Sequence, residues 1–167
     1  MDHSTHAGLP LHHHHEGPAH AGRVSLDRIA FLATLHCLAG CAVGEVAGMV
    51  IGTAAGLSNG ETIALAVVLA FISGYAFTMA PLLRAGYAFG AASRLALAAD
   101  TASIAVMEIV DNLVMLAIPG AMDAPLDSAL FWTSLAGALA IAGVAAFPLN
   151  RWLIARGKGH AVVHAHH

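Results

Sequence analysis

Four long apolar segments, separated by turn or charged residues, dominate the sequence and restrict its fold. They cover about residues 27–57, 61–83, 91–118 and 128–155. Each reaches the ~20 residues that a helix needs to cross the hydrocarbon core of a bilayer. Charged residues make up only 10 % of the chain, well below the roughly 25 % of soluble domains. The sequence therefore predicts an all-α integral membrane protein: a four-helix bundle of two in-out-in helical hairpins.

The polar ends of the chain lie outside this apolar region. We expect residues 1–25 to form a disordered, His-rich tail, residues 26–156 the transmembrane domain, and residues 157–167 a second His-rich tail. No phosphate-binding loop, Gly-x-Ser-x-Gly turn or basic nucleic-acid-binding surface is present. We therefore expect a lipid-embedded protein that does not bind nucleic acid, and we assign it no catalytic residue.

The cationic residues predict an orientation in the membrane. All seven flank the predicted spans on one side, and the two opposite connections contain none. Because cytoplasmic loops carry the excess of Lys and Arg, both termini are expected in the cytoplasm of a cell whose plasma (inner) membrane holds the protein. The residues are Arg23, Arg28, Arg84, Arg94, Arg151, Arg156 and Lys158.

Thiols and a carboxylate share one face of the first predicted span. At ~100° per residue, Cys37, Cys41 and Glu45 fall within an arc of about 80°. Glycines recur every four residues along the same span, in a pattern typical of close helix packing. The same stripe is also suited to contacts between subunits, so we expect a homo-oligomer. The glycines are Gly40, Gly44, Gly48, Gly52 and Gly56.

A second polar face lies on the third predicted span. Asp100, Met107, Glu108, Asp111 and Met115 fall within an arc of about 100°. An ionised carboxylate near the bilayer centre costs at least ~2.5 kcal/mol, and no cationic residue within the spans offsets it, except Arg94 at the edge. Protons, bound cations or water must then compensate. The alternative is that the acids are protonated and only join the helices through hydrogen bonds.

The residue types indicate which ions such a site favours. Counting along the helices gives one layer of Glu45, Glu108 and Asp111, and a second layer of His36, Cys37, Cys41 and Asp100 about two turns toward the cytoplasm. Thiolate, imidazole and carboxylate together favour zinc or copper over magnesium or calcium. Met107 and Met115 would extend the soft ligands toward copper(I), or would simply pack the core. His36 could instead face another helix or the lipid headgroups.

Histidines in both tails point independently to transition metals. Eleven of the twelve histidines lie outside the spans, and His-rich tracts are typical metal-binding segments. A solvated tail without this role is the alternative. The densest tracts contain His12, His13, His14 and His15 near the amino end, and His164, His166 and His167 at the carboxyl end.

Three segments carry a resemblance to a known family: His36 to Glu45, Met107 to Asn112, and Asn150 to Trp152. Over roughly Leu26 to the C-terminus, the chain resembles an uncharacterised bacterial membrane family catalogued as a domain of unknown function. Some of its members are labelled copper oxidases, which implies copper. The chain is too short for cupredoxin domains and lacks their strand pattern, so we keep copper and discard the oxidase.

These patterns lead to three functional hypotheses. The first is a membrane protein that binds and transports or handles copper or zinc through the intramembrane Cys, His and carboxylate groups. The second is a redox or assembly subunit in which Cys37 and Cys41 exchange thiols or pass copper to a metalloprotein partner. The third is a proton-coupled carrier or channel that uses Glu45, Glu108 and Asp111 as a relay.

Overall fold

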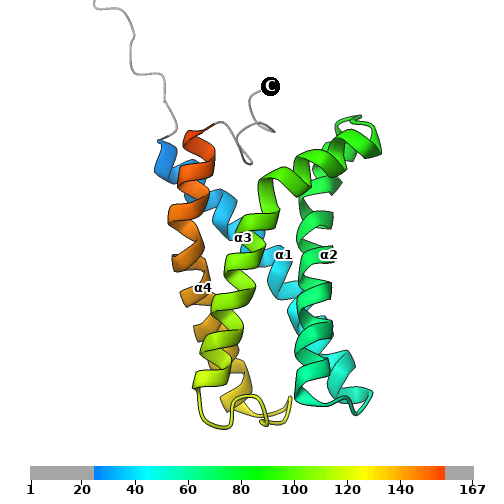
Figure 1. Cartoon of the computed structure of the whole chain (residues 1–167), viewed down its shortest axis with the longest axis vertical. Coiled ribbons are helices and arrows are strands. Elements are labelled where there is room, and N and C mark those ends of the chain that lie inside the picture. Colours follow the sequence, from blue (N-terminus) through cyan, green and yellow to red (C-terminus); the bar gives the residue numbers. More distant parts are fainter. Residues whose placement is uncertain (1–24, 157–167) are drawn as a thin grey trace, which may run out of the picture.

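The computed structural model describes residues 25–156, which form a bundle of four α-helices without strands in that range (Figure 1). The helices are α1 (Leu26–Ala54), α2 (Asn59–Arg84), α3 (Phe89–Ala117) and α4 (Ala129–Ala155). This confirms the predicted fold class. The two predicted His-rich tails, with all their histidines, lie outside the described residues.

Three of the helices in this range, α1, α2 and α4, are long and apolar enough to cross a membrane. α3 is not among them, although it has the same 29 residues as α1. It carries Arg94, Asp100, Glu108 and Asp111. Large apolar side chains are exposed around the bundle, for example Val43 on α1, Ile72 on α2, Ile109 on α3 and Val144 on α4. A surface of this kind suits a lipid environment.

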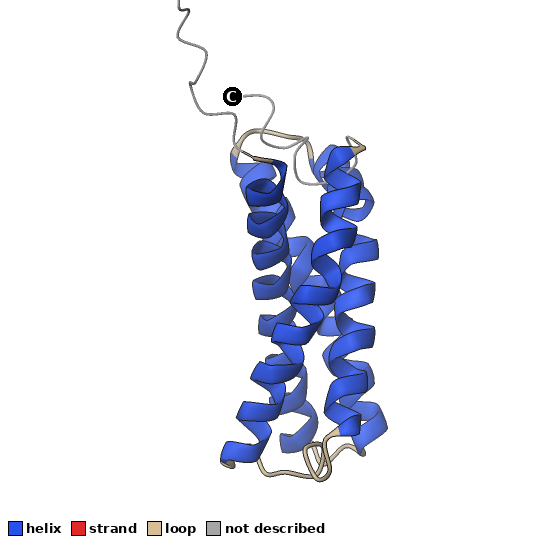
Figure 2. Ribbon diagram, turned by 90° about the vertical axis from the view of Figure 1, so that its left-hand side faces the viewer, coloured by secondary structure: helices blue, strands red, loops and turns tan. Residues whose placement is uncertain are grey.

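Consecutive helices run in alternating directions, so α1 and α3 are parallel (Figures 1 and 2). α1 packs against α2 and α4, and α3 packs against the same two helices. α1 and α3 therefore lie diagonally across the bundle and approach each other through its centre. Any polar face that both helices turn inward meets there.

The glycines of α1 bring it close to α2. An added Cβ atom on Gly44 would lie 2.2 Å from the carbonyl oxygen of Leu69, and one on Gly48 would lie 2.3 Å from the Cα atom of Ala66. Ser73 on α2 uses this proximity to donate a hydrogen bond to the Gly40 carbonyl oxygen, at 2.5 Å. The stripe is thus occupied inside the bundle and is not available for a contact between subunits. The homo-oligomer stays a prediction without this support.

Gly56 does not belong to the stripe, which corrects the sequence prediction. α1 ends at Ala54, before the predicted Leu57, and Gly56 follows with a φ of 69°. Its N–H bonds the Thr53 carbonyl, and the N–H of Leu57 bonds the Gly52 carbonyl. This is a Schellman motif, which favours glycine because the left-handed backbone strains other residues. A four-residue spacing cannot separate such a glycine from a packing glycine.

The connection to α2 is equally compact. Ser58 caps α2 by accepting a hydrogen bond from the Glu61 N–H, and the Glu61 carboxylate accepts one from the Ser58 N–H at 2.9 Å. This reciprocal pair is a capping box. α1 and α2 are therefore joined by a short turn whose backbone groups are largely paired.

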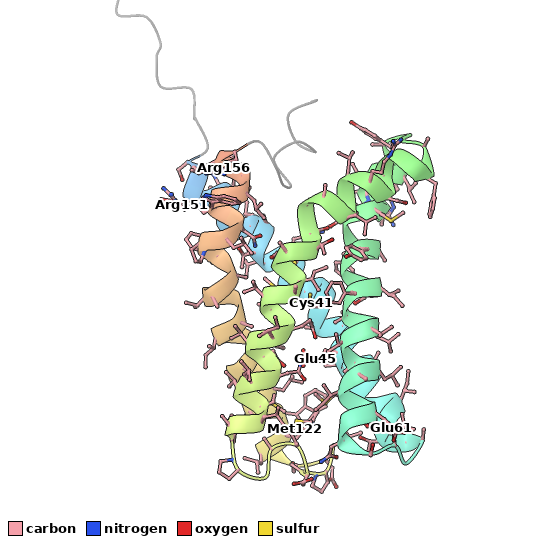
Figure 3. The ribbon with its side chains drawn as sticks, in the orientation of Figure 1. Cys41, Glu45, Glu61, Met122, Arg151 and Arg156 are labelled. Atoms are coloured by element: carbon pink, nitrogen blue, oxygen red, sulfur yellow. The ribbon has the colours of Figure 1, made fainter. Side chains whose placement is uncertain are left out.

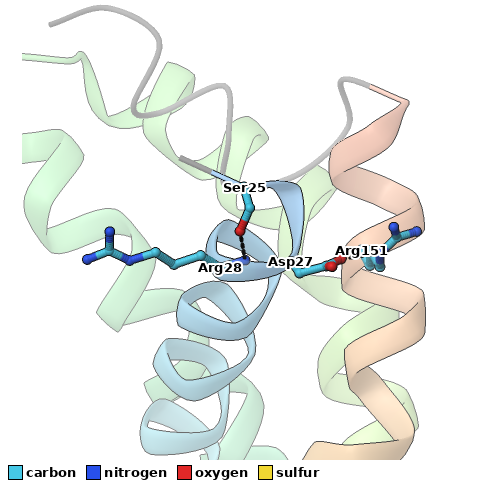
Figure 4. Close-up of polar contacts among 4 residues, drawn as sticks. All are labelled: Ser25, Asp27, Arg28 and Arg151. Carbon is cyan, nitrogen blue, oxygen red and sulfur yellow. Dashed lines mark hydrogen bonds and ion pairs between the residues drawn. The ribbon is translucent and has the colours of Figure 1, made fainter. Parts of the chain in front are cut away.

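The two ends of the bundle differ in charge. The basic end contains the start of α1, the α2–α3 turn and the end of α4, with all the arginines of the described range (Figure 3). There the exposed Asp27 of α1 forms an ion pair with Arg151 of α4 (Figure 4). The opposite end contains the α1–α2 turn and the α3–α4 loop, and we call it the acidic end. There Asn59 of α2 donates a hydrogen bond to Asp123 in the α3–α4 loop, at 2.8 Å.

A buried hydrogen bond also joins α1 to α4. The Asn150 amide donates to the Thr34 hydroxyl at 2.9 Å, and that hydroxyl donates to the Ala30 carbonyl oxygen at 2.8 Å. Both side chains are at least nine-tenths buried. Asn150 therefore positions the basic-end half of α4 against α1.

Candidate functional site

The polar faces of α1 and α3 meet in the centre of the bundle. The Cys37 thiol has the Cys41 thiol, one turn along α1, and the Ser103 side chain of α3 as its polar neighbours. Both cysteines are free and buried. The thiols therefore form a pair at the middle of the interface, and α3 contributes a hydroxyl beside it.

Carboxylates follow the thiols toward the acidic end. Cys41 lies within reach of the Glu108 carboxylate, and Glu45 lies within reach of the Asp111 carboxylate. Figure 3 shows Cys41 and Glu45 at mid-height, with Glu45 nearer the acidic end. Thiols and carboxylates thus form one continuous row. We call Cys37, Cys41, Glu45, Glu108 and Asp111 the central row.

The acids of the central row are buried without a cationic partner. Glu45 and Asp111 are each 1 % exposed, and Glu108 is 5 % exposed. In the described part of the chain, no N–H or O–H group donates to either oxygen of Glu45 or of Asp111. Two ionised carboxylates cannot donate to each other, so this buried pair requires a proton on one of them, a bound cation or water.

His36 and Asp100 lie toward the basic end and differ in surroundings. The His36 ring packs edge-on against Phe77 of α2, with 5.9 Å between ring centroids. His36 therefore faces α2, one of the two orientations that the sequence left open. Asp100 is 2 % exposed and lies close enough to Cys37 for their charges to interact. Asp100 thus extends the row, and the His36 ring lies beside Phe77.

The methionines divide between two core clusters. Met107 packs with Cys37 and Cys41 at mid-height. Met115 packs instead near the acidic end with Met49, which is not among the predicted ligands. A signal was available, because Met49 follows Glu45 by four residues, as Met115 follows Asp111. Methionine is common in cores, so this spacing alone did not distinguish a ligand.

The side chains of the row meet mainly in pairs. Within residues 25–156, no three His, Cys, Asp or Glu side chains are already gathered as a cage for a metal ion. The pairs offer two thiols at one level and two carboxylates at the next. Chemically, such a row can hold protons, or it can bind a cation after side-chain rotation.

The chain belongs to the family described as "Domain of unknown function (DUF4396)", whose sequence model matches residues 28–159. The match covers all four helices except the first two residues of α1, and it includes the whole central row. No curated protein and no solved structure matches the chain.

Proposed function

We propose that this member of the DUF4396 family is an integral membrane protein that binds a transition-metal ion, copper or zinc, in its central row and conducts it through the bundle. In this proposal all four helices span the bilayer. α3 is held there by α2 and α4, which cover its sides, and by α1, which faces its charged groups.

One observation carries the proposal: the Glu45 and Asp111 carboxylates are buried neighbours, and neither accepts a hydrogen bond from residues 25–156. A buried charge that lacks its partner strongly destabilises a folded protein. The central row contains no positive charge that could pair with these carboxylates. A bound cation would supply that charge. The thiols one turn away add soft ligands, which favours copper or zinc over magnesium or calcium.

The arginines support an orientation for this site. Five of them lie at the basic end in the described range: Arg28, Arg84, Arg94, Arg151 and Arg156. By the positive-inside rule, this end faces the cytoplasm and the Asn59–Asp123 end faces outward. Both termini would then be cytoplasmic, where their histidines could exchange metal with the row.

The proposal is tested by metal content. The full-length protein, with its eleven tail histidines replaced by alanine, is purified in detergent and dialysed against Zn(II) or Cu(I). We expect about one ion per chain by elemental analysis. Glu45→Gln is expected to weaken binding by roughly tenfold or more, because it removes one charged ligand. Glu61→Gln, outside the row, is the matched control and should bind as the parent does.

Failure would be recognised in two ways. If the tail-histidine-free protein retains no metal at saturating concentration, the central row is not a metal site. If metal is retained but Glu45→Gln and Cys41→Ser bind it equally well, the metal lies elsewhere. Transport is then tested by metal-dependent fluorescence in proteoliposomes, where Glu45→Gln should abolish uptake.

A proton-coupled carrier is the second candidate, and the same carboxylate pair favours it. A proton shared between Glu45 and Asp111 also satisfies both side chains. This function predicts pH-driven flux that survives replacement of both thiols by serine. Flux that depends on Cys37 and Cys41 would instead support metal as the cargo.

A further inference from the structure

Three methionines gather at the acidic end of the bundle, beyond the central row. Met49 of α1 is 3 % exposed, Met115 of α3 is fully buried, and the partly buried Met122 of the α3–α4 loop packs against the same cluster. Five methionines lie in residues 25–156, so three of the five, from three different elements, meet in one place. Figure 3 shows Met122 at the acidic end, beyond Glu45.

The positions of two of these methionines follow from the acids. Met49 lies four residues after Glu45, and Met115 lies four residues after Asp111. Residues four apart on a helix lie one above the other. α1 and α3 run in the same direction (Figure 1), and the Glu45 and Asp111 side chains are neighbours across the interface. One turn further, the two thioethers therefore face the same interface.

The three methionines pack in a cluster of apolar side chains. The cluster also contains Phe131 and Leu135 of α4. In such a dry environment a divalent ion with a strong hydration shell is costly to bind, and neutral thioethers do not offset its charge. A soft monovalent ion is compatible with it, because thioethers select copper(I) among the common biological metals.

We infer that Met49, Met115 and Met122 form a thioether site for a soft monovalent cation of the copper(I) type. The identity of the transported ion rests here on the proposed function. The methionines add a second binding site, and they favour copper over zinc. A copper(I) ion would pass from thiols and carboxylates to thioethers on its way to the acidic end. Zinc, which thioethers bind poorly, would stop at the carboxylates.

The test uses Ag(I), a redox-inert probe for copper(I) sites. Thiolates bind Ag(I) strongly, so the protein carries Cys37→Ser and Cys41→Ser in the full-length, tail-histidine-free form. We expect this protein to bind about one Ag(I) in calorimetry. Replacing Met49, Met115 and Met122 together by leucine should weaken that binding by at least about tenfold. Leucine has nearly the volume of methionine, so the packing is kept.

A matched control and a second readout separate a ligand from a packing role. Met79→Leu, on α2 at the basic end, should leave Ag(I) affinity unchanged. X-ray absorption of the Ag(I)-loaded protein should show sulfur neighbours, which are lost in the triple leucine variant. If that variant does not fold, Met122→Leu alone, which changes only a loop residue, should still weaken Ag(I) binding by about threefold.

The outcomes distinguish this inference from the proposed function. Ag(I) affinity that is unchanged by Met122→Leu and by the triple replacement would overturn the thioether site, even if the parent protein binds Zn(II) at Glu45. Loss of Ag(I) binding with Zn(II) binding intact supports both. Methionine-dependent Ag(I) binding in a protein whose Glu45→Gln variant keeps all its metal supports the thioether site and contradicts the central row.

Discussion

The two inward faces of α1 differ in packing and in the pairing of their polar groups. Toward α2, glycines let two backbones touch, and Ser73 donates to the Gly40 carbonyl. Toward α3, thiols and carboxylates meet across the bundle, and within residues 25–156 Glu45 accepts no hydrogen bond. The first face maximises packing, and the second leaves buried polar atoms incompletely paired. The contrast indicates that the α1–α2 face maintains the fold, whereas the α1–α3 face has a different role.

The largest effect is expected on the glycine face. Gly48→Val would place a side chain where even a Cβ atom meets the backbone of Ala66 at 2.3 Å. Separating the helices should cost about 3 kcal/mol or more of unfolding free energy. Thermal melting in detergent, followed by circular dichroism, measures it. Gly137→Val on α4, where nothing lies within 4 Å of the added atom, is the control. Equal melting temperatures for the two variants would contradict the tight packing of Gly48 against α2.

The central row should respond in the opposite direction. Glu45→Gln gives the Asp111 carboxylate an N–H donor, so the metal-free protein should gain about 1–2 kcal/mol of stability. The gain should be largest at alkaline pH, where the acids of the parent protein are most ionised. The same substitution should reduce the stabilisation that added metal provides. A variant that melts below the parent at alkaline pH would show that the pair already stabilises the fold.

A smaller loss is expected where α1 meets α4. Thr34→Val and Asn150→Leu each remove one partner of a buried hydrogen bond and should each cost about 1–2 kcal/mol. Because both substitutions break the same contact, the double variant should lose less than the sum of the single losses. Additive losses would mean that the two side chains act independently. Metal binding is expected to be unchanged, since neither residue belongs to the central row.

The smallest effect is expected at the surface. Asp27 and Arg151 form an ion pair whose side chains are 65 % and 49 % exposed. Asp27→Asn should change the unfolding free energy by less than about 0.5 kcal/mol. The difference should shrink further in high salt. A loss above 1 kcal/mol, measured as a shift in melting temperature, would show that this surface pair stabilises the fold as much as a buried hydrogen bond does.

The sequence predicted the helices and the composition of the α1–α3 face. Cys37, Cys41 and Glu45 lie on one arc because the helical repeat is regular, and the structure turns that arc toward α3. The repeat gives angles around one helix, but it does not say which neighbour lies at each angle. The glycines therefore suited either close packing inside the bundle or a contact between subunits, and only the structure assigns them to α2.

Two residues show why the remaining details depended on tertiary structure. The helical repeat left the neighbour of His36 open, and in the structure its ring contacts Phe77, which lies 41 positions away in the sequence. Met122 belongs to a loop without periodicity, so no pattern connects it with Met49 or Met115. Contacts between distant segments decide both cases, and they follow from how the helices are arranged.

The tight turn between α1 and α2 has a consequence for how the chain assembles. Gly56 and Leu57 close the end of α1, and Ser58 caps the start of α2. The contacts between the α1 glycines and α2 begin within two turns of this connection. Contacts between neighbouring segments form early in folding, because little chain entropy is lost. The α1–α2 hairpin can thus be complete before α3 leaves the ribosome. α3, the least apolar helix of the bundle, would then fold against a preformed partner that already presents Glu45 and the thiols.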